Sequence, residues 1–189
     1  ERIRLFAISK LNWIKKHQAN FNKQVRQPES EFLTGESHYY LGNRYLLNVF
    51  RKDRGQCVKV RNKNNIDLFV RNIDSFDNRK RVFNDWYRSE MKSLLPELIE
   101  KWEPIIGVNV LEWGVKRMKT RWGSCNVKAK RIWLNLEMIK KPMELIEYVV
   151  VHELIHLIER GHGKRFYKLM DSYYPDWKRC KKELNRLPL

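Results

Sequence analysis

The spacing of hydrophobic positions changes along the chain and predicts its secondary structure. Apolar residues that recur on one broad face predict helices, and short β-branched or aromatic runs bounded by Gly or Asn predict strands. The predicted helices are residues 3–26, 78–103, 142–160 and 164–173, and a short one after Pro175. The predicted strands are the two arms of a hairpin within 37–50 and residues 57–60, 66–70, 108–118 and 131–136.

Proline and glycine mark several of the predicted boundaries. Pro28 ends the first helix, and Pro96 is expected to kink or break the second. Pro142 stands where a first helical turn begins, and Gly161 stops that helix. The hairpin is expected to turn at Gly42-Asn43. Because helices and strands come in separate blocks, the predicted fold class is α+β.

Composition excludes several classes of protein. The chain has 39 Lys and Arg against 22 Asp and Glu, a formal charge of +17, while 42% of residues are hydrophobic and 12% aromatic. It is too apolar for a disordered chain. There is no run of 18 apolar residues, so we expect no membrane span. No secretory signal is visible at the start of the sequence. The three cysteines are far apart and form no Cys-x-x-Cys pair, which suits inert thiols in a reducing cytoplasm.

The chemistry is concentrated in the apolar segment around His152, Glu153 and His156. Two histidines four residues apart lie on one face of a helix, where both imidazoles can bind one Zn²⁺. Glu153 then lies beside the metal without being a ligand and can accept a proton from water there. The alternative is a core helix with hydrogen-bonded histidines, but polar groups without partners would cost a few kcal/mol in this apolar run.

Two residues are candidates for a third ligand. His162 lies just past the predicted helix stop, where a turn can bring it back toward the metal. Glu159 is the competing candidate, but it follows His156 closely on the same helix. Three protein ligands leave a position open for water, as in catalytic zinc sites.

These and further residues resemble the YgjP-like metal-dependent hydrolase family, a zincin type of metallopeptidase fold akin to the SprT proteins. The resemblance covers about residues 82–184. It is carried by Trp86-Tyr87-Arg88, Arg121-Trp122-Gly123-Ser124-Cys125, Ile132-x-Leu134-Asn135, Pro142, Tyr148-Val149-Val150-Val151-His152-Glu153-Leu154-x-His156-Leu157, Gly161-His162-x-x-x-Phe166 and Pro175-Asp176-Trp177-Lys178. Arg160-Gly161 departs slightly from the family pattern and leaves the ligand spacing intact.

The resemblance implies one zinc ion held by His152, His156 and His162, with Glu153 as catalytic acid and base. It also implies a small mixed or antiparallel sheet packed on the metal-binding helix. We expect residues 76–189 to form the catalytic core. Residues 1–75 are expected to add a helix and a β-hairpin to the same unit, with a portion upstream of Glu1 missing.

The residues that bind substrate are less defined by the sequence. Peptidases of this kind bind an extended polypeptide along an edge strand, and Arg131–Leu136 is the candidate, with Asn135 at its end. A buried strand with a capping Asn is an equal alternative. Arg121, Tyr148 and Tyr174 are candidate donors to the developing oxyanion. The Trp122-Gly123-Ser124 segment is expected to be a loop that supports the metal-binding helix or lines the cleft.

The basic charge leaves a second class of function open. Residues 116–131 hold seven Lys or Arg and no acid. Such a segment can favour acidic polypeptides or hold nucleic-acid phosphates. The hypotheses are therefore a cytoplasmic zinc peptidase and, alternatively, a basic nucleic-acid-associated module or a protease acting on DNA-bound proteins.

Overall fold

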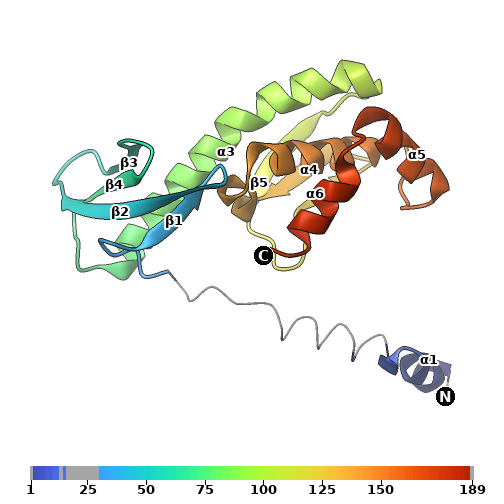
Figure 1. Ribbon diagram of the computed structural model, residues 1–189, viewed down its shortest axis with the longest axis horizontal. Helices are drawn as coiled ribbons and strands as arrows, with labels where there is room; N and C mark the ends of the chain where they lie inside the picture. The colour runs from blue at the N-terminus through green and yellow to red at the C-terminus, as the bar shows by residue number, and fades with distance from the viewer. Residues whose placement is uncertain (1, 13–14, 16–29, 188–189) are drawn as a thin grey trace.

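The computed structural model describes residues 2–12, 15 and 30–187 (Figure 1). Its elements, in chain order, are α1 Arg2–Ser9, β1 Ser37–Tyr40, β2 Asn43–Arg51, β3 Cys57–Val60, β4 Asn65–Val70, α3 Phe76–Ile106, β5 Glu112–Lys116, β6 Gly123–Asn126, β7 Arg131–Asn135, the 3-10 helix η1 Leu136–Lys140, α4 Met143–Ile155, α5 Lys164–Tyr173 and α6 Trp177–Leu184. The α+β class is confirmed. The remainder of the predicted first helix, residues 13–14 and 16–26, lies outside the described residues. Within the described part of the chain, no helix is both long and apolar enough to cross a bilayer.

The first sheet has the strand order β1-β2-β4-β3. The predicted hairpin is confirmed, but its turn is Leu41-Gly42, one residue earlier than expected, because Tyr40 pairs with Asn43. Both turn residues have positive φ, 47° and 82°, as hairpin turns of this length require. The backbone N–H of Leu41 donates to the carbonyl of Ile139 (2.9 Å), a tertiary contact that helps to hold this non-glycine residue in place.

The second sheet has the order β5-β7-β6, with β5 and β7 parallel and β6 and β7 antiparallel. One prediction is wrong here, because residues 123–126, expected within a loop, form strand β6. Residues 131–136 form the central strand β7 and the start of η1, which is the predicted alternative of a buried strand with a capping Asn and not a substrate-binding edge. Both edges of β7 are hydrogen-bonded to neighbouring strands, which leaves β6 as the edge beside α4.

The long helix α3 connects the two sheets and packs against α4 (Figure 1). The side chain of Ser75 caps its start, and Gly107 ends it with φ of 78°. The helix continues through Pro96, where a kink or a break was expected, so there is no break. Pro96 removes the helical partner of the Lys92 carbonyl, and because Lys92 is exposed, water can supply a replacement donor.

Helix α4 is almost entirely buried and carries the segment that is predicted to bind a metal ion. Val149, Val150 and Val151 belong to a core cluster that also contains Leu47 and Ile66 of the first sheet. The helix ends at Ile155, five residues before the predicted end at Arg160. His156 is its C-cap and keeps helical dihedral angles, so the one-turn relation to His152 is preserved.

Candidate functional site

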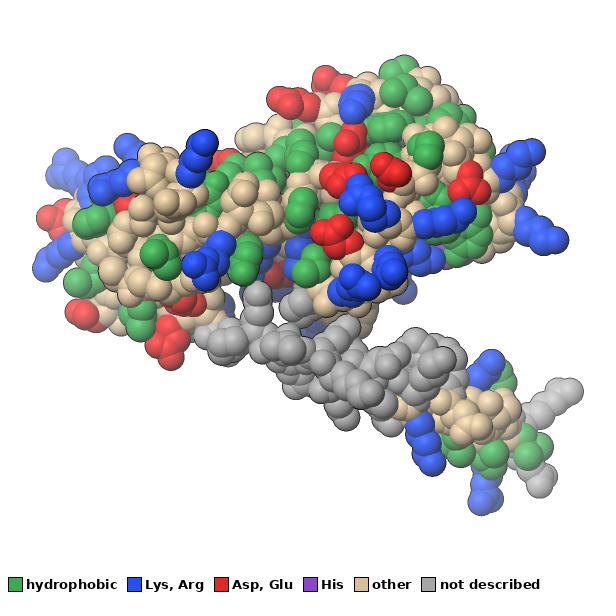
Figure 2. All heavy atoms as spheres, viewed as in Figure 1, with side chains coloured by type: hydrophobic (Ala, Val, Ile, Leu, Met, Phe, Trp, Pro, Cys, Tyr) green, Lys and Arg blue, Asp and Glu red, His purple; other side chains and the backbone are tan. Residues whose placement is uncertain are grey.

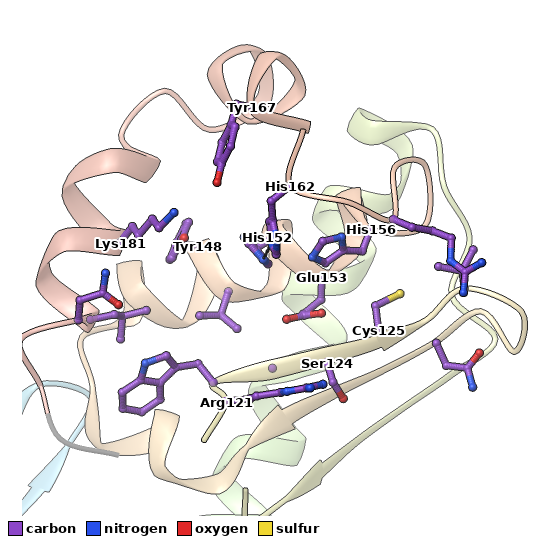
Figure 3. A pocket seen from close by; sticks show the side chains of 18 residues that line it. Arg121, Ser124, Cys125, Tyr148, His152, Glu153, His156, His162, Tyr167 and Lys181 are labelled. Atoms are coloured by element: carbon purple, nitrogen blue, oxygen red, sulfur yellow. Dashed lines mark hydrogen bonds between the residues drawn. The ribbon is translucent and has the colours of Figure 1, made fainter. Parts of the chain in front are cut away.

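Three histidines from α4 and the α4–α5 loop converge at one point (Figure 3). His152 lies in the last turn of α4, His156 is the C-cap, and His162 comes from the following loop. One ligand atom from each lies within 4.8 Å of the others, and Nε2 of His162 is 3.0 Å from Nε2 of His152. The predicted return of His162 toward α4 is thus what the structure shows.

The protonation of these imidazoles fits a metal cation. Burial, followed by the neighbouring His156 and His162, lowers the pKa of His152 to about 3, so its ring is neutral at pH 7. Burial and His156 also lower the pKa of His162. Nδ1 of His156 lies 3.0 Å from the carbonyl of Glu159, so this nitrogen carries the proton and Nε2 is left as the ligand atom. This is the donor set that zinc and similar ions prefer.

Glu159, the alternative third ligand, is not part of the histidine cluster. Its carboxylate accepts a hydrogen bond from the backbone N–H of Gly161 (3.4 Å) and lies 3.8 Å from Nε of Arg165. Its backbone, by contrast, orients His156. Glu159 therefore supports the cluster through its carbonyl, whereas His162 supplies the third imidazole.

Phe166, at the start of α5, supports all three histidines. Its ring centroid is 4.9, 4.7 and 4.8 Å from those of His152, His156 and His162, and the side chain is 1% exposed. Phe166 follows His162 by four residues and belongs to the family-like motif, but the sequence alone gave it no role. Packing of this kind holds the rings in position before an ion binds.

The carboxyl group of Glu153 is buried between α4 and β6. Its residue is 5% exposed, and burial raises its pKa to about 8, an effect that the charge of Arg121 opposes. The close approach depends on Gly123, because a Cβ there would stand 2.6 Å from Oε1 of Glu153. A glycine is required at this point of β6 for the carboxylate to keep its place.

The histidines and Glu153 open into a cavity of about 930 Å³ between β6, α4, α5 and α6 (Figure 3). Arg121, Tyr148, Tyr167 and Lys181 also line it, and in Figure 3 the hydroxyl of Tyr167 is directed toward the cavity. Tyr167 and Lys181 were not identified from the sequence, because they belong to α5 and α6 and only the tertiary fold brings them to α4.

Two predicted substrate contacts lie away from the cavity. Asn135 is 0% exposed, and its amide donates to the carbonyls of Met118 and Arg121 (both 2.8 Å). Its side-chain oxygen accepts from the backbone of Met118 and Glu137, so Asn135 fixes the loop before β6 and caps the start of η1, as the alternative of a capping Asn predicted. The hydroxyl of Tyr174 donates its hydrogen to the carbonyl of Glu144. This hydrogen is therefore already used and does not serve the proposed oxyanion.

The basic segment 116–131 is divided among several internal contacts. Arg131 pairs with Glu112 (3.0 Å), Arg117 with Glu137 (3.4 Å), and the ammonium of Lys116 lies 5.0 Å from the ring of Trp133.

Cys125 on β6 is no nucleophile at neutral pH, because burial and the nearby Glu153 raise the pKa of its thiol to about 11.

The fold and the site together define a metal-dependent hydrolase. The model of the YgjP-like metallopeptidase domain matches residues 1–187, and the chain therefore belongs to this family. It is a metal-dependent peptidase, and its substrates are polypeptides. No curated protein matches the sequence.

Two solved structures share part of the fold. The chain is similar to the metallopeptidase zymogen of Pyrococcus abyssi abylysin, with 20% identity over 47% of this chain and 90% of that one, and a TM-score of 0.44. It is also similar to the metallopeptidase zymogen of Methanocaldococcus jannaschii jannalysin, with 22% identity over 47% and 91% of the two chains and a TM-score of 0.42.

Proposed function

We propose that this peptidase depends on zinc and cleaves peptide bonds with Glu153 as its general base. The observation that carries the proposal is the convergence of His152, His156 and His162 beside the buried carboxyl group of Glu153. The three imidazoles supply the nitrogen ligands that suit zinc in catalytic sites. When bound, the ion acidifies water and polarises the substrate carbonyl as a Lewis acid.

Glu153 moves the proton in this proposal. Its carboxylate takes a proton from the attacking water and then delivers it to the departing amine. Burial raises the pKa of Glu153 toward the neutral range, which suits a group that must both accept and donate. Gly123 admits the carboxylate close to β6, and the charge of Arg121 favours its ionised form.

The substrate is proposed to bind as an extended strand along the free edge of β6. This edge lines the cavity next to Glu153, and an edge strand offers backbone donors and acceptors for pairing. Arg121, Tyr148 and Tyr167 line the same cavity and are the donors placed to bind the carbonyl oxygen as it becomes negative.

The nucleic-acid alternative receives less support. Its sequence argument was the acid-free segment 116–131, and three of its cations now have partners within the fold. The histidine cluster has no catalytic role in a nucleic-acid-associated module, whereas it is central to a metallopeptidase, including one that acts on DNA-bound proteins.

Metal analysis together with peptide hydrolysis tests the proposal. We expect about one zinc per chain in the wild type, and loss of both zinc and activity in His152→Ala. Glu153→Gln should keep the zinc and reduce kcat at least about 100-fold, since it removes the general base. Glu159→Gln is the matched control, a nearby acid outside the cluster, and should keep both.

A Glu153→Gln enzyme with the wild-type rate would contradict the role of Glu153. A protein that hydrolyses peptides with another metal, and not with zinc, would contradict the choice of ion while leaving the family assignment intact.

A further inference from the structure

Helix α6 carries a basic hollow that continues from the catalytic cavity. This second hollow, of about 420 Å³, shares Lys181 and Asn185 with the cavity around the histidines. Four of its six lining residues are cations, and the complete set is Trp177, Lys178, Lys181, Lys182, Asn185 and Arg186. A chain that lies in the catalytic cavity therefore has a continuous, positively charged path along α6.

Lys181 has a defined position at the junction of the two hollows. Its Nζ lies 5.3 Å from the ring centroid of Tyr167 and 5.6 Å from that of Trp177. These rings stack on each other at 5.0 Å with an interplanar angle of 17°, and the indole N–H of Trp177 donates to Asp171 (2.8 Å). Contact of an ammonium with aromatic faces stabilises it and restricts its motion.

Lys181 is also close to the metal-binding rings. In Figure 3 its side chain extends from α6 toward Tyr148 and the histidines. It lines the same cavity as His152, His156 and His162. A substrate group that contacts Lys181 is therefore near the bond to be cleaved.

Most of the charge of this path is not neutralised by nearby acids. Figure 2 shows Lys and Arg side chains over the region of α6, with acidic side chains among them. Of the four cations of the path, Lys178 pairs with Asp171, whereas Glu144 and Glu183 pair with Arg179, which lies outside the path. Within residues 30–187, no ion pair joins Lys181, Lys182 or Arg186 to a carboxylate. Among the residues that the structure describes, the buried Glu153 is the single acid that lines either hollow.

We propose that α6 forms a substrate subsite that binds acidic side chains of the polypeptide on one side of the cleaved bond. Lys181 contacts the acidic residue nearest that bond, and Lys182 and Arg186 contact residues farther along the path. This rests on the proposed function, since it assumes that the polypeptide passes the histidine cluster. The phosphates of a nucleic acid would also pair with these cations. The path begins at the cavity around the histidines, however, and this favours a polypeptide that extends from the cavity along α6.

Matched peptides test the subsite. Each has one cleavable core, a blocked N-terminus and an amidated C-terminus, and carries Glu, Gln or Lys at one of several positions flanking the bond. With the wild-type zinc enzyme, kcat/KM should be about 5-fold higher for Glu than for Gln at the best position, and lowest for Lys. The ratio should fall toward one at high salt, because the groups are solvent-exposed.

Variants of α6 connect this preference to the helix. Lys181→Met should bring the Glu-to-Gln ratio near one at the position closest to the bond. Lys181→Glu should invert it, so that the Lys peptide becomes the better substrate. Lys182→Met combined with Arg186→Met should reduce the ratio at more distant positions. Lys168→Met is the control, an exposed cation on α5 that lines neither hollow, and should leave rates and ratios unchanged.

A binding measurement separates this subsite from the proposed chemistry. The Glu153→Gln protein should bind the fluorescently labelled Glu peptide about 5-fold more tightly than the Gln peptide, and Lys181→Glu should reverse this preference. If the wild type cleaves no peptide but this binding holds, the proposed chemistry fails and the subsite stands.

Three results would overturn the subsite. The first is cleavage with a Glu-to-Gln ratio of one. The second is a preference that Lys181→Glu does not change. The third is a single-stranded oligonucleotide that binds more tightly than the Glu peptide and depends on the same lysines, which would make α6 a nucleic-acid surface.

Discussion

The two sheets of the molecule each bring a glycine against the metal-binding helix, at different points. In the first sheet, a Cβ at Gly42 would stand 2.8 Å from Cγ of Pro142, which caps the start of α4. In the second sheet, a Cβ at Gly123 would stand 2.6 Å from the carboxylate of Glu153. One contact determines where α4 begins, and the other determines where the carboxylate of the proposed general base lies.

This difference separates stability from activity. The turn of the first sheet is also hydrogen-bonded to the chain before α4, from Leu41 to Ile139 and from Gly42 to Lys140. Those contacts dock one structural element on another and involve no group of the cavity. At Gly123, by contrast, the contacted atom belongs to the proposed general base. Equivalent Gly→Ala changes should therefore have different effects.

The largest effect is expected from Gly123→Ala. The added methyl group forces the carboxylate of Glu153 to shift, and a displacement of about 1 Å can cost about 100-fold in rate. We expect kcat for peptide hydrolysis to fall about 100-fold while zinc content stays unchanged, because the three atoms nearest to the added methyl group all belong to Glu153. Steady-state kinetics and metal analysis of the same preparation measure both. A fully active Gly123→Ala enzyme would show that the exact place of the carboxylate is unimportant.

Gly42→Ala should mainly lower stability. A side chain at φ of 82° costs about 1–2 kcal/mol, and the contact with Pro142 adds overpacking of about 1–3 kcal/mol. We expect a loss of about 3 kcal/mol in the free energy of unfolding by urea, with kcat of the folded protein nearly unchanged. Gly35→Ala is the control, since φ is 89° but nothing lies within 4 Å, and should lose about 1 kcal/mol. Equal losses at both positions would mean that the Pro142 contact contributes nothing.

The sequence predicted those parts of the fold that depend on local pattern. Helix α5 has the predicted bounds, Lys164–Tyr173, because its apolar face, the preceding glycine and its length are all contained in ten residues. Strand order was not predictable in this way. The edge position of β6 and the central position of β7 depend on pairing with β5, which no periodicity within a strand encodes.

The candidate site divides along the same line. His152, Glu153 and His156 were identified because helical spacing alone puts them together, and His162 because it follows a helix stop. Gly123 could be recognised only as part of a motif, since its role depends on the distance from β6 to α4. The division of the chain at residue 75 stays a prediction, although one core cluster contains residues from both sides of it.

The smallest effect concerns His38, the buried histidine of the first sheet. Burial lowers the pKa of His38 as it does that of His152, but His38 does not belong to the histidine cluster. His38 is 5% exposed between the rings of Phe32 and Phe83. Burial lowers its pKa to about 4, and the charge of Lys140 adds to this, while Glu36 opposes it. The unfolded chain therefore takes up the proton first, and stability falls as the pH drops from about 6.5 toward 4.

His38→Phe keeps a ring between Phe32 and Phe83 and removes this titration. Relative to the wild type, the variant should gain up to about 2 kcal/mol in unfolding free energy between pH 8 and pH 5. Urea unfolding at several pH values measures the gain. It should be the same with and without zinc, because His38 belongs to the first sheet, whereas any low-pH gain from replacing His152 should depend on the metal. If the gain in unfolding free energy of His38→Phe depended on zinc, the titration of His38 in the first sheet would be coupled to the histidine cluster on α4.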